Sequence, residues 1–211
     1  MARPASQARR RPTNTAAAGD LADELLKAAA ALVAERGPQR FSLREVARRA
    51  RVSEAAPYWH FANKEALLAG VAEQGFTALA GLMAEVRRRV KDPHRQLQEL
   101  GVAYVRFALT HPSHLRVMFG PEIQDKSAHP TLKVAAERAF GLLVSAISEG
   151  QRAGQVRDGD PEELAVSAWA LVHGLSALII DGQLRRRVRN DREARRLATR
   201  VTKLLQNGLT R

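Results

Sequence analysis

The sequence predicts an all-α protein with a small N-terminal helical head and a larger helical domain behind it. Hydrophobic residues make up 45% of the chain but aromatic residues only 5%, so small and aliphatic side chains must build the core. Such a composition favours helices. Apolar residues recur at helical spacing in one segment after another, and breaks at Gly and Pro divide them into about nine helices with no convincing strand.

Basic residues are densest at the N-terminal end. The formal net charge is +12, and residues 1–64 hold twelve Lys or Arg against six acids, a net +6 on less than a third of the chain. Lys and Arg that neutralise phosphates release counterions and so favour polyanionic partners. We therefore expect nucleic acid to bind near the N-terminus.

The first element in chain order is a basic arm. Residues 1–19 carry four arginines, no acid and no apolar periodicity, which predicts a disordered segment. Its arginines either enter a minor groove or raise DNA affinity without specificity. Asp20 is then the expected N-cap of a helix that ends at Gly37 and Pro38.

Residues 41–64 predict two short helices joined by a tight turn. Ser42 and Ser53 stand where these helices, over about residues 43–50 and 54–60, would begin. The inward-facing positions are apolar, as in Leu43, Val46 and Ala47. This is the layout of a helix-turn-helix, whose second helix lies in the DNA major groove.

A long, rigid helix is expected to connect the head to the second domain. Asn63 can cap it, and its apolar stripe runs to about Val90. Further helices are expected over residues 93–110, a short piece at 113–119, then 131–152, 161–180 and 191–207. The domain boundaries follow as 1–19 for the arm, 20–66 for the DNA-binding head and 67–211 for effector binding and dimerisation.

Membrane, secretory and disulfide-linked proteins are disfavoured. The most apolar stretch, residues 164–180, contains His173 and Gly174, so no membrane span is expected. The N-terminus lacks the apolar segment of a secretory signal, and the chain has no cysteine. We expect a soluble cytoplasmic protein.

The order of motifs resembles the tetracycline-repressor-like (TetR) family of bacterial transcription regulators, closely over residues 20–70 and loosely in length and helix count. The family pattern stands here as Leu43, Val46, Ala47, Ala50, Val52, Ser53, Tyr58, Phe61, Lys64, Glu65 and Leu67. The C-terminal half also resembles a subgroup with a Trp-His-Gly signature, through Trp169, His173 and Gly174.

Two residues depart from the family pattern. Arg51 occupies a turn position where the family usually has Gly, so a positive φ there would be strained. Pro57 falls inside the recognition helix and fits only in its first turns.

Few side chains of so short a recognition helix can reach base edges. Glu can accept a hydrogen bond from cytosine N4, Ala can contact a thymine methyl, and Arg can donate two hydrogen bonds to guanine. The resemblance implies phosphate contacts at the Tyr and Lys positions of the motif. Tyr58 could instead pack in the core, as we expect for Phe61, and Lys64 could simply be solvated. The candidate DNA contacts are Ser42, Arg44, Arg51, Ser53, Glu54, Ala55, Ala56, Tyr58, His60 and Lys64.

The large side chains of the second domain are candidates for an effector pocket, because ligand pockets are mostly apolar with a few polar groups. Each of them could equally be ordinary core. The candidates are Phe76, Met83, Tyr104, Phe107, Met118, Phe119, Trp169 and His173. His111, His114 and His129 lack the spacing and acidic partner of a metal site, so no metal or other cofactor is expected.

The last two helices carry more apolar residues than one small domain would bury, which predicts a homodimer. A two-fold dimer is also what a helix-turn-helix needs to read two half-sites. The candidate interface residues are Leu164, Ala168, Leu171, Leu175, Leu178, Val201, Leu204 and Leu205. Eight arginines between Arg185 and Arg200 form either a second anion-binding surface or a solvated loop and outer helix face.

The sequence thus predicts a repressor that binds a palindromic operator in double-stranded DNA and is released by a small apolar or amphipathic molecule. The alternative is an effector-independent, basic architectural DNA-binding protein. The motifs GxSxG, HExxH, GxGxxG and the P-loop are absent, as is a cysteine nucleophile, which argues against an enzyme.

Overall fold

The computed structural model describes the backbone of residues 14–209 and, within it, the side chains of residues 19–204 and 208. This part of the chain is all helical, with eight α-helices, two short 3-10 helices and no strand, which confirms the predicted fold class. The elements are α1 (Asn14–Arg36), α2 (Leu43–Arg49), η1 (Ala56–Trp59), α3 (Lys64–Arg89), α4 (Pro93–Thr110), α5 (Pro112–Phe119), η2 (Lys126–Ala128), α6 (Pro130–Arg152), α7 (Pro161–Ile180) and α8 (Asp191–Leu209).

Helix α1 is longer than the sequence predicts. It begins at Asn14, so residues 14–19, expected in the arm, are helical, and Asp20 lies inside the helix instead of capping it. The rest of the expected arm, residues 1–13 with its four arginines, lies outside the described residues. At the other end Gly37 has a φ of +81°, the left-handed conformation in which Gly commonly ends a helix.

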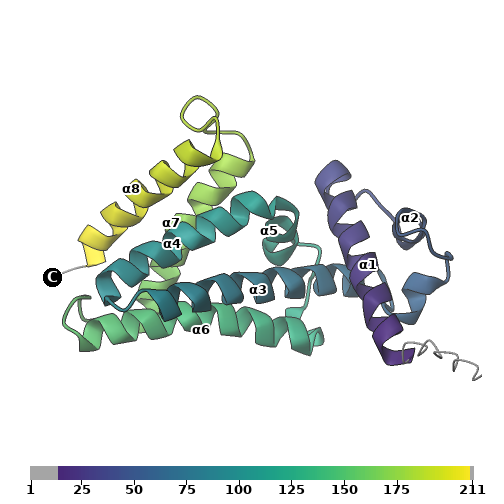
Figure 1. Cartoon of the computed structure of the whole chain (residues 1–211), viewed down its shortest axis with the longest axis horizontal. Coiled ribbons are helices and arrows are strands. Elements are labelled where there is room, and N and C mark those ends of the chain that lie inside the picture. Colours follow the sequence, from purple (N-terminus) through teal and green to yellow (C-terminus); the bar gives the residue numbers. More distant parts are fainter. Residues whose placement is uncertain (1–13, 210–211) are drawn as a thin grey trace, which may run out of the picture.

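The N-terminal head consists of α1, α2, η1 and the first turns of α3 (Figure 1). Asn63 caps α3 as predicted, since its Oδ1 accepts a hydrogen bond of 2.8 Å from the backbone N–H of Ala66. At about 1.5 Å per residue, the 26 residues of α3 span about 39 Å. One hydrophobic core cluster includes Leu25 and Val46 in the head and Val105 and Leu132 in the body. The head and body are therefore joined through a packed helix.

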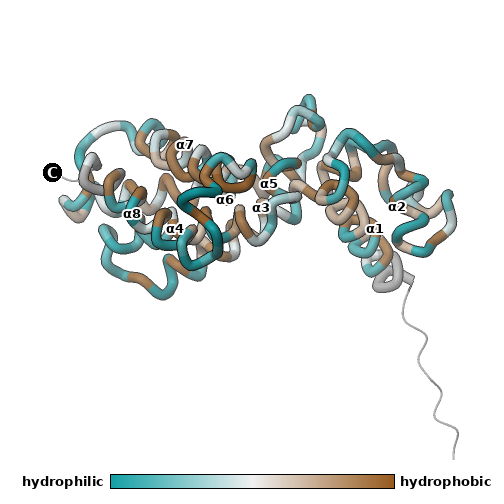
Figure 2. Tube along the Cα trace, turned by 90° about the horizontal axis from the view of Figure 1, so that it is seen from above, coloured by the Kyte–Doolittle hydropathy of each residue, from teal (hydrophilic) through white to brown (hydrophobic). Residues whose placement is uncertain are grey.

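The body is a bundle built around α3. Helix α3 packs against α4, α5 and α6, while α4 also packs against α7 and α8, and α6 against α7 (Figure 1). Hydrophobic and hydrophilic residues alternate along most helices, as Figure 2 shows, so each helix has an inward and an outward face. In Figure 1 the chain turns back from α7 to α8 at the top of the body, and the α6–α7 connection lies at the end of the body farthest from α1 and α2.

Two helices, α3 and α7, are long and apolar enough by length and composition to cross a membrane, contrary to the expectation from the sequence. In the structure α3 is enclosed by four other helices, and α7 packs against α4, α6 and α8. Core helices of globular proteins meet the same criterion. This packing accounts for the apolar residues of α3, whereas α7 keeps Leu171 and Leu178 exposed.

Candidate DNA interface and effector cavity

Helix α2 is fixed by a complete capping box. Ser42 Oγ accepts from the backbone N–H of Glu45, and Glu45 Oε2 accepts in turn from the backbone N–H of Ser42 at 2.9 Å. That backbone hydrogen bond is the main reason why the pKa of Glu45 is lowered. Ser42 Oγ also donates to Glu45 Oε2, so the hydroxyl of this expected phosphate contact is already engaged within the helix cap.

The turn after α2 is a Schellman motif with Arg in the glycine position. The backbone N–H of Val52 bonds to Ala47 O at 3.0 Å, and that of Arg51 bonds to Arg48 O at 3.2 Å. Arg51 has a φ of 58° and is the one non-glycine residue with positive φ in the described part of the chain. The predicted strain is therefore present, and it costs about 1–2 kcal/mol for a residue with a Cβ.

The recognition segment is shorter than predicted and is not α-helical. The sequence predicted a helix over residues 54–60, whereas the structure has a turn followed by the four-residue 3-10 helix η1. Pro57 has no N–H to start an α-helical ladder, and hydrogen bonds to the third residue back form instead, as from Ala56 N to Ser53 O. Ala55 holds the N-cap position, so the prediction that Ser53 begins this helix is wrong.

Two neighbouring aromatic side chains project from η1. Tyr58 is 54% exposed and Trp59 is 75% exposed, although residues of this size are seldom left in water. Trp59 was not among the predicted contacts, and the sequence signal that could have identified it is its place beside Tyr58 in the motif PYWHF. Ala56 is 3% exposed, so the prediction that it contacts bases is wrong.

The other candidate base contacts lie on the surface next to this aromatic pair. Ser53, Glu54 and Ala55 are exposed in the turn before η1, and Arg51 is exposed just before them. Arg44 Nε lies 3.6 Å from Glu54 Oε2, so the two side chains form an ion pair across the motif. Any base that binds one of them must therefore disturb or include the other.

Lys64 has a structural partner. Its Nζ donates a hydrogen bond of 2.8 Å to Gln39 O and lies 4.4 Å from the centre of the Phe41 ring. Burial lowers its pKa. These contacts fasten the loop before α2 to the start of α3. His60 is half-buried and Phe61 packs against the core, as expected for Phe61.

A cavity of about 470 Å³ lies in the body among α3, α4, α6, α7 and the α5–α6 connection. Its volume falls in the ~300–1,000 Å³ range of ligand sites. Five of the eight predicted residues line it, together with several that the sequence did not single out, notably Lys126 and Phe140. The lining is Phe76, Leu79, Met83, Tyr104, Phe119, Lys126, Ala136, Glu137, Ala139, Phe140, Leu143, Val166 and Trp169.

The other three predicted pocket residues do not line this cavity. Phe107 is fully buried and stacks on His111 with ring centres 5.0 Å apart. Met118 is fully buried against Gly75 of α3. Both belong to the core, so their assignment to the cavity lining is wrong. His173 lies behind the lining, edge-on to Phe119 at 4.6 Å.

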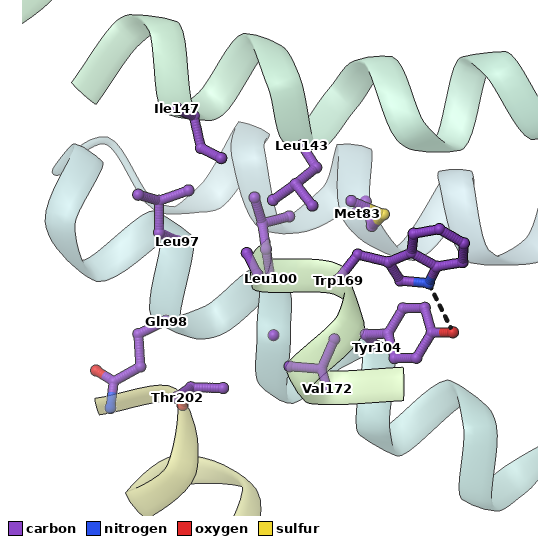
Figure 3. A pocket seen from close by; sticks show the side chains of 12 residues that line it. Met83, Leu97, Gln98, Leu100, Tyr104, Leu143, Ile147, Trp169, Val172 and Thr202 are labelled. Carbon is purple, nitrogen blue, oxygen red and sulfur yellow. Dashed lines mark hydrogen bonds between the residues drawn. The ribbon is translucent and has the colours of Figure 1, made fainter. Parts of the chain in front are cut away.

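A smaller chamber of about 50 Å³ adjoins the cavity (Figure 3). Met83, Tyr104, Leu143 and Trp169 line both spaces, so these four side chains separate them. Trp169 Nε1 donates a hydrogen bond of 3.3 Å to Tyr104 Oη, the dashed line in Figure 3. The small chamber reaches Gly101 of α4 and Thr202 of α8.

The polar groups near the cavity form a chain. Tyr104 Oη lies 2.8 Å from Nδ1 of His173, and Trp169 donates to the same oxygen. Burial raises the pKa of Tyr104 and lowers that of His173, so both are neutral near pH 7. An imidazole nitrogen is a much stronger base than a phenol oxygen, so we assign the Tyr104 proton as donated to His173.

The apolar stripe of helix α7 is only partly buried in the single chain. Leu164, Ala168 and Leu175 are buried in the chain's own core and cannot form a surface for a partner, so their assignment to a dimer interface is wrong. Leu171 and Leu178, seven residues apart and therefore on one helix face, are 38% and 47% exposed. On α8, Leu204 is exposed and Val201 is half-buried, while the side chain of Leu205 lies outside the described residues.

The eight arginines between Arg185 and Arg200 are all exposed. They occupy the α7–α8 connection and the outer face of α8, which belong to the body and not to the head (Figure 1). Within the described residues, no three His, Cys, Asp or Glu side chains gather as a metal site would require.

Two family models match the chain. Residues 25–71 match the model for bacterial regulatory proteins of the tetR family, and residues 97–204 match a tetracyclin repressor-like C-terminal domain. The first match covers the second half of α1, then α2, η1 and the start of α3, and the second covers most of the body. Together they include both the aromatic pair on η1 and the larger part of the cavity.

Individual proteins resemble the chain as well. An HTH-type transcriptional repressor of Mycobacterium tuberculosis, Rv3405c, is 34% identical over 97 residues, which is 44% of this chain and 50% of that protein. The chain thus spans about half the length of this curated relative. The solved structure of a protein with unknown function from Rhodococcus sp. RHA1 is 28% identical and superposes with a TM-score of 0.78, covering 98% of this chain and 100% of that one. FadR from Bacillus subtilis in complex with stearoyl-CoA shares the fold, with a TM-score of 0.74 over 89% of this chain and 98% of that one at 16% identity.

Proposed function

The chain belongs to the tetR family of bacterial regulatory proteins, and on that premise we propose that it is a ligand-responsive repressor acting as a homodimer on a palindromic operator. DNA binding and transcription regulation follow from the family itself. Our proposal adds that the protein forms a dimer, that its operator is symmetric and that a ligand releases it from DNA. It also places this action in the cytoplasm.

The exposed pair Tyr58 and Trp59 carries the proposal for the DNA interface. The capped helix α2 and the 3-10 turn η1 hold both side chains at the surface, where neither contributes to the core. A Tyr hydroxyl and a Trp N–H are donors for phosphate oxygens, and such contacts position a protein on the duplex. Arg44, Glu54 and Arg51 then lie beside the pair as candidate base readers.

The exposed face of α7 supports the dimer. Leu171 and Leu178 stay exposed in the single chain, and Gly174 between them has no neighbouring atom near its Cβ position. A second copy packed on this face would bury these leucines and place two heads on one duplex. Dimeric helix-turn-helix proteins read half-sites about 34 Å apart, or a multiple of that distance.

The cavity supports an effector. It lies against α3, the helix that runs unbroken into the head, so a ligand that shifts α3 would change the spacing of two heads in a dimer. A ligand weakens DNA binding only if it binds the non-operator state more tightly. FadR, which shares the fold, was solved with stearoyl-CoA, a molecule with a long apolar chain.

Genomic footprinting with the purified protein tests the function. We expect a small set of inverted repeats, bound by two copies and retained in a gel shift at physiological salt. Bound DNA should be released by some apolar small molecules in a screen. Binding spread evenly over unrelated sequences, with no release by any compound, would contradict a ligand-responsive repressor and favour an architectural role.

A further inference from the structure

The inference concerns the chemical class of the effector, and it rests on the proposed function. Two charged side chains belong to the cavity lining, Lys126 and Glu137. Lys126 Nζ uses one of its three hydrogens on Met118 O at 2.9 Å and lies 5.8 Å from the centre of the Phe119 ring. Glu137 is exposed and lies 3.7 Å from the Nζ of Lys133 on the same helix. The charge that remains to face a ligand is therefore positive.

The interior of the cavity offers almost nothing to a polar ligand group. Apart from Lys126 and Glu137 its lining side chains are aliphatic or aromatic, and among these only Tyr104 and Trp169 carry a hydrogen-bonding group. Trp169 donates to Tyr104, and Tyr104 is bonded to His173, so the donors of both lining residues are already used. A polar group buried there would lose its water without finding a partner. The buried part of a ligand is therefore apolar, and its polar part remains beside Lys126.

The apolar space is also longer than the main cavity alone. The chamber behind Trp169 is lined by Leu97, Leu100 and Ile147 and shares four wall residues with the cavity (Figure 3). Trp169 donates a hydrogen bond of 3.3 Å, packs against Phe119 with ring centres 5.4 Å apart, and is only partly buried. A slender chain entering beside Lys126 would therefore contact Trp169, one of the four residues between the two spaces.

We propose that the cavity binds an amphipathic anion whose unbranched apolar chain lies inside and whose carboxylate or phosphate head pairs with Lys126. A charge-assisted hydrogen bond to Lys126 would hold the head at the entrance. The position of the chain against Trp169 makes that residue a reporter of binding.

The test uses the full chain with Trp59→Phe, which leaves Trp169 as the single tryptophan of the protein. Trp169 emission is followed during titration with dodecanoate, dodecyl phosphate, dodecanol and dodecylammonium, all below their micelle concentrations. At least one of the two anions should bind about tenfold more tightly than dodecanol, the advantage expected of a charge-assisted pair. Comparison of the two anions distinguishes a carboxylate head from a phosphate head.

Variants at Lys126 assign the preference to that residue. Lys126→Gln should remove the advantage of the anions, and Lys126→Arg should keep it, because the charge is retained. Lys91→Gln is the matched control, since it removes the same charge from an exposed position between α3 and α4, away from the cavity lining, and should leave the preference unchanged.

Dodecanol or dodecylammonium binding as tightly as the anions would overturn the inference while leaving an apolar effector in place. A preference that persists in Lys126→Gln would also overturn it. If no probe alters Trp169 emission, both this inference and the apolar effector fail, whereas DNA binding, measured separately by gel shift, is not affected by that result.

Discussion

Tyr104 and His173, which are 69 residues apart in sequence, share a hydrogen bond of 2.8 Å that ties α4 to α7 beside the cavity. Trp169 donates to the same tyrosine oxygen from the next turn of α7. The three side chains form a neutral polar chain in apolar surroundings, and their arrangement depends on His173 remaining unprotonated.

Stability should therefore fall in mild acid. Burial lowers the pKa of His173 and also that of His114, which its neighbour His111 lowers further. Below the ordinary His pKa of about 6.5 the unfolded chain takes up protons that the folded chain does not, so stability is constant above this pH and declines below it. Melting temperatures from pH 5 to 8 would show the decline. His173→Gln should reduce it, and a profile identical to that of the unmodified protein would contradict this account.

Gly101 should not tolerate a larger side chain. A Cβ at this position would lie 2.5 Å from Thr202 Cγ2 and 3.3 Å from Val172 Cγ1, where α4, α7 and α8 meet. We expect Gly101→Ala to lower the free energy of unfolding by about 1–3 kcal/mol, as overpacking does. Gly141→Ala, on α6 with no atom near its Cβ position, is the control and should stabilise by about 0.5–1 kcal/mol. Urea denaturation measures both, and equal effects would refute the packing argument.

Arg51→Gly should stabilise the head. Glycine adopts the φ of 58° without strain, and the gain of about 1–2 kcal/mol is partly offset by the flexibility of Gly in the unfolded chain. Arg48→Gly, inside α2, is the matched control and should destabilise by about 1 kcal/mol. If Arg51 also reads a base, the glycine variant will be more stable yet less selective among operator sequences, which competition gel shifts would reveal.

The aromatic pair on η1 should be needed for DNA binding on every sequence. We expect Tyr58→Ala and Trp59→Ala each to weaken binding about tenfold without lowering the melting temperature, because both side chains are exposed. Val134→Ala, an exposed apolar residue on α6, is the control and should have no effect. Undiminished DNA affinity in the Tyr58 variant would contradict the proposed contact between this aromatic pair and the DNA backbone.

The charged residues of the head should divide into two groups. Lys64→Ala is expected to reduce the slope of log affinity against log salt by about 1 if Lys64 also reaches a phosphate. The same substitution should also destabilise the head, because the hydrogen bond from Lys64 Nζ to Gln39 O is lost. Changes at Arg44 or Glu54 should instead alter which operator is preferred. A selection from random DNA would show that difference, and an unaltered preference would exclude this ion pair from base reading.

The α7 face should be required for the dimer. Leu171→Glu or Leu178→Glu places a charge on the exposed face, and we expect monomers in sedimentation equilibrium and loss of operator affinity. Val134→Glu, equally accessible on α6, is the control for an added surface charge and should leave the dimer intact. A dimer that survives both leucine variants would place the interface elsewhere.

The sequence by itself determined the features that depend on neighbours within about four residues. The capping box at Ser42, the N-cap at Asn63, the left-handed turn at Arg51 and the all-helical class follow from short-range hydrogen bonds and apolar periodicity. Even the short 3-10 recognition turn, where an α-helix was predicted, has a local cause in the missing N–H of Pro57.

Only the tertiary structure decided which apolar residues face the cavity, the core or a partner. Phe107 and Phe119 look alike in the sequence, yet one is fully buried against His111 and the other lines the cavity beside Lys126. Leu171 and Leu175 likewise lie one turn apart on the same apolar helix, yet Leu171 is exposed and Leu175 is buried. These outcomes depend on which helices pack together, and that packing joins residues far apart in the chain, such as Phe119 with Trp169 at 5.4 Å between ring centres.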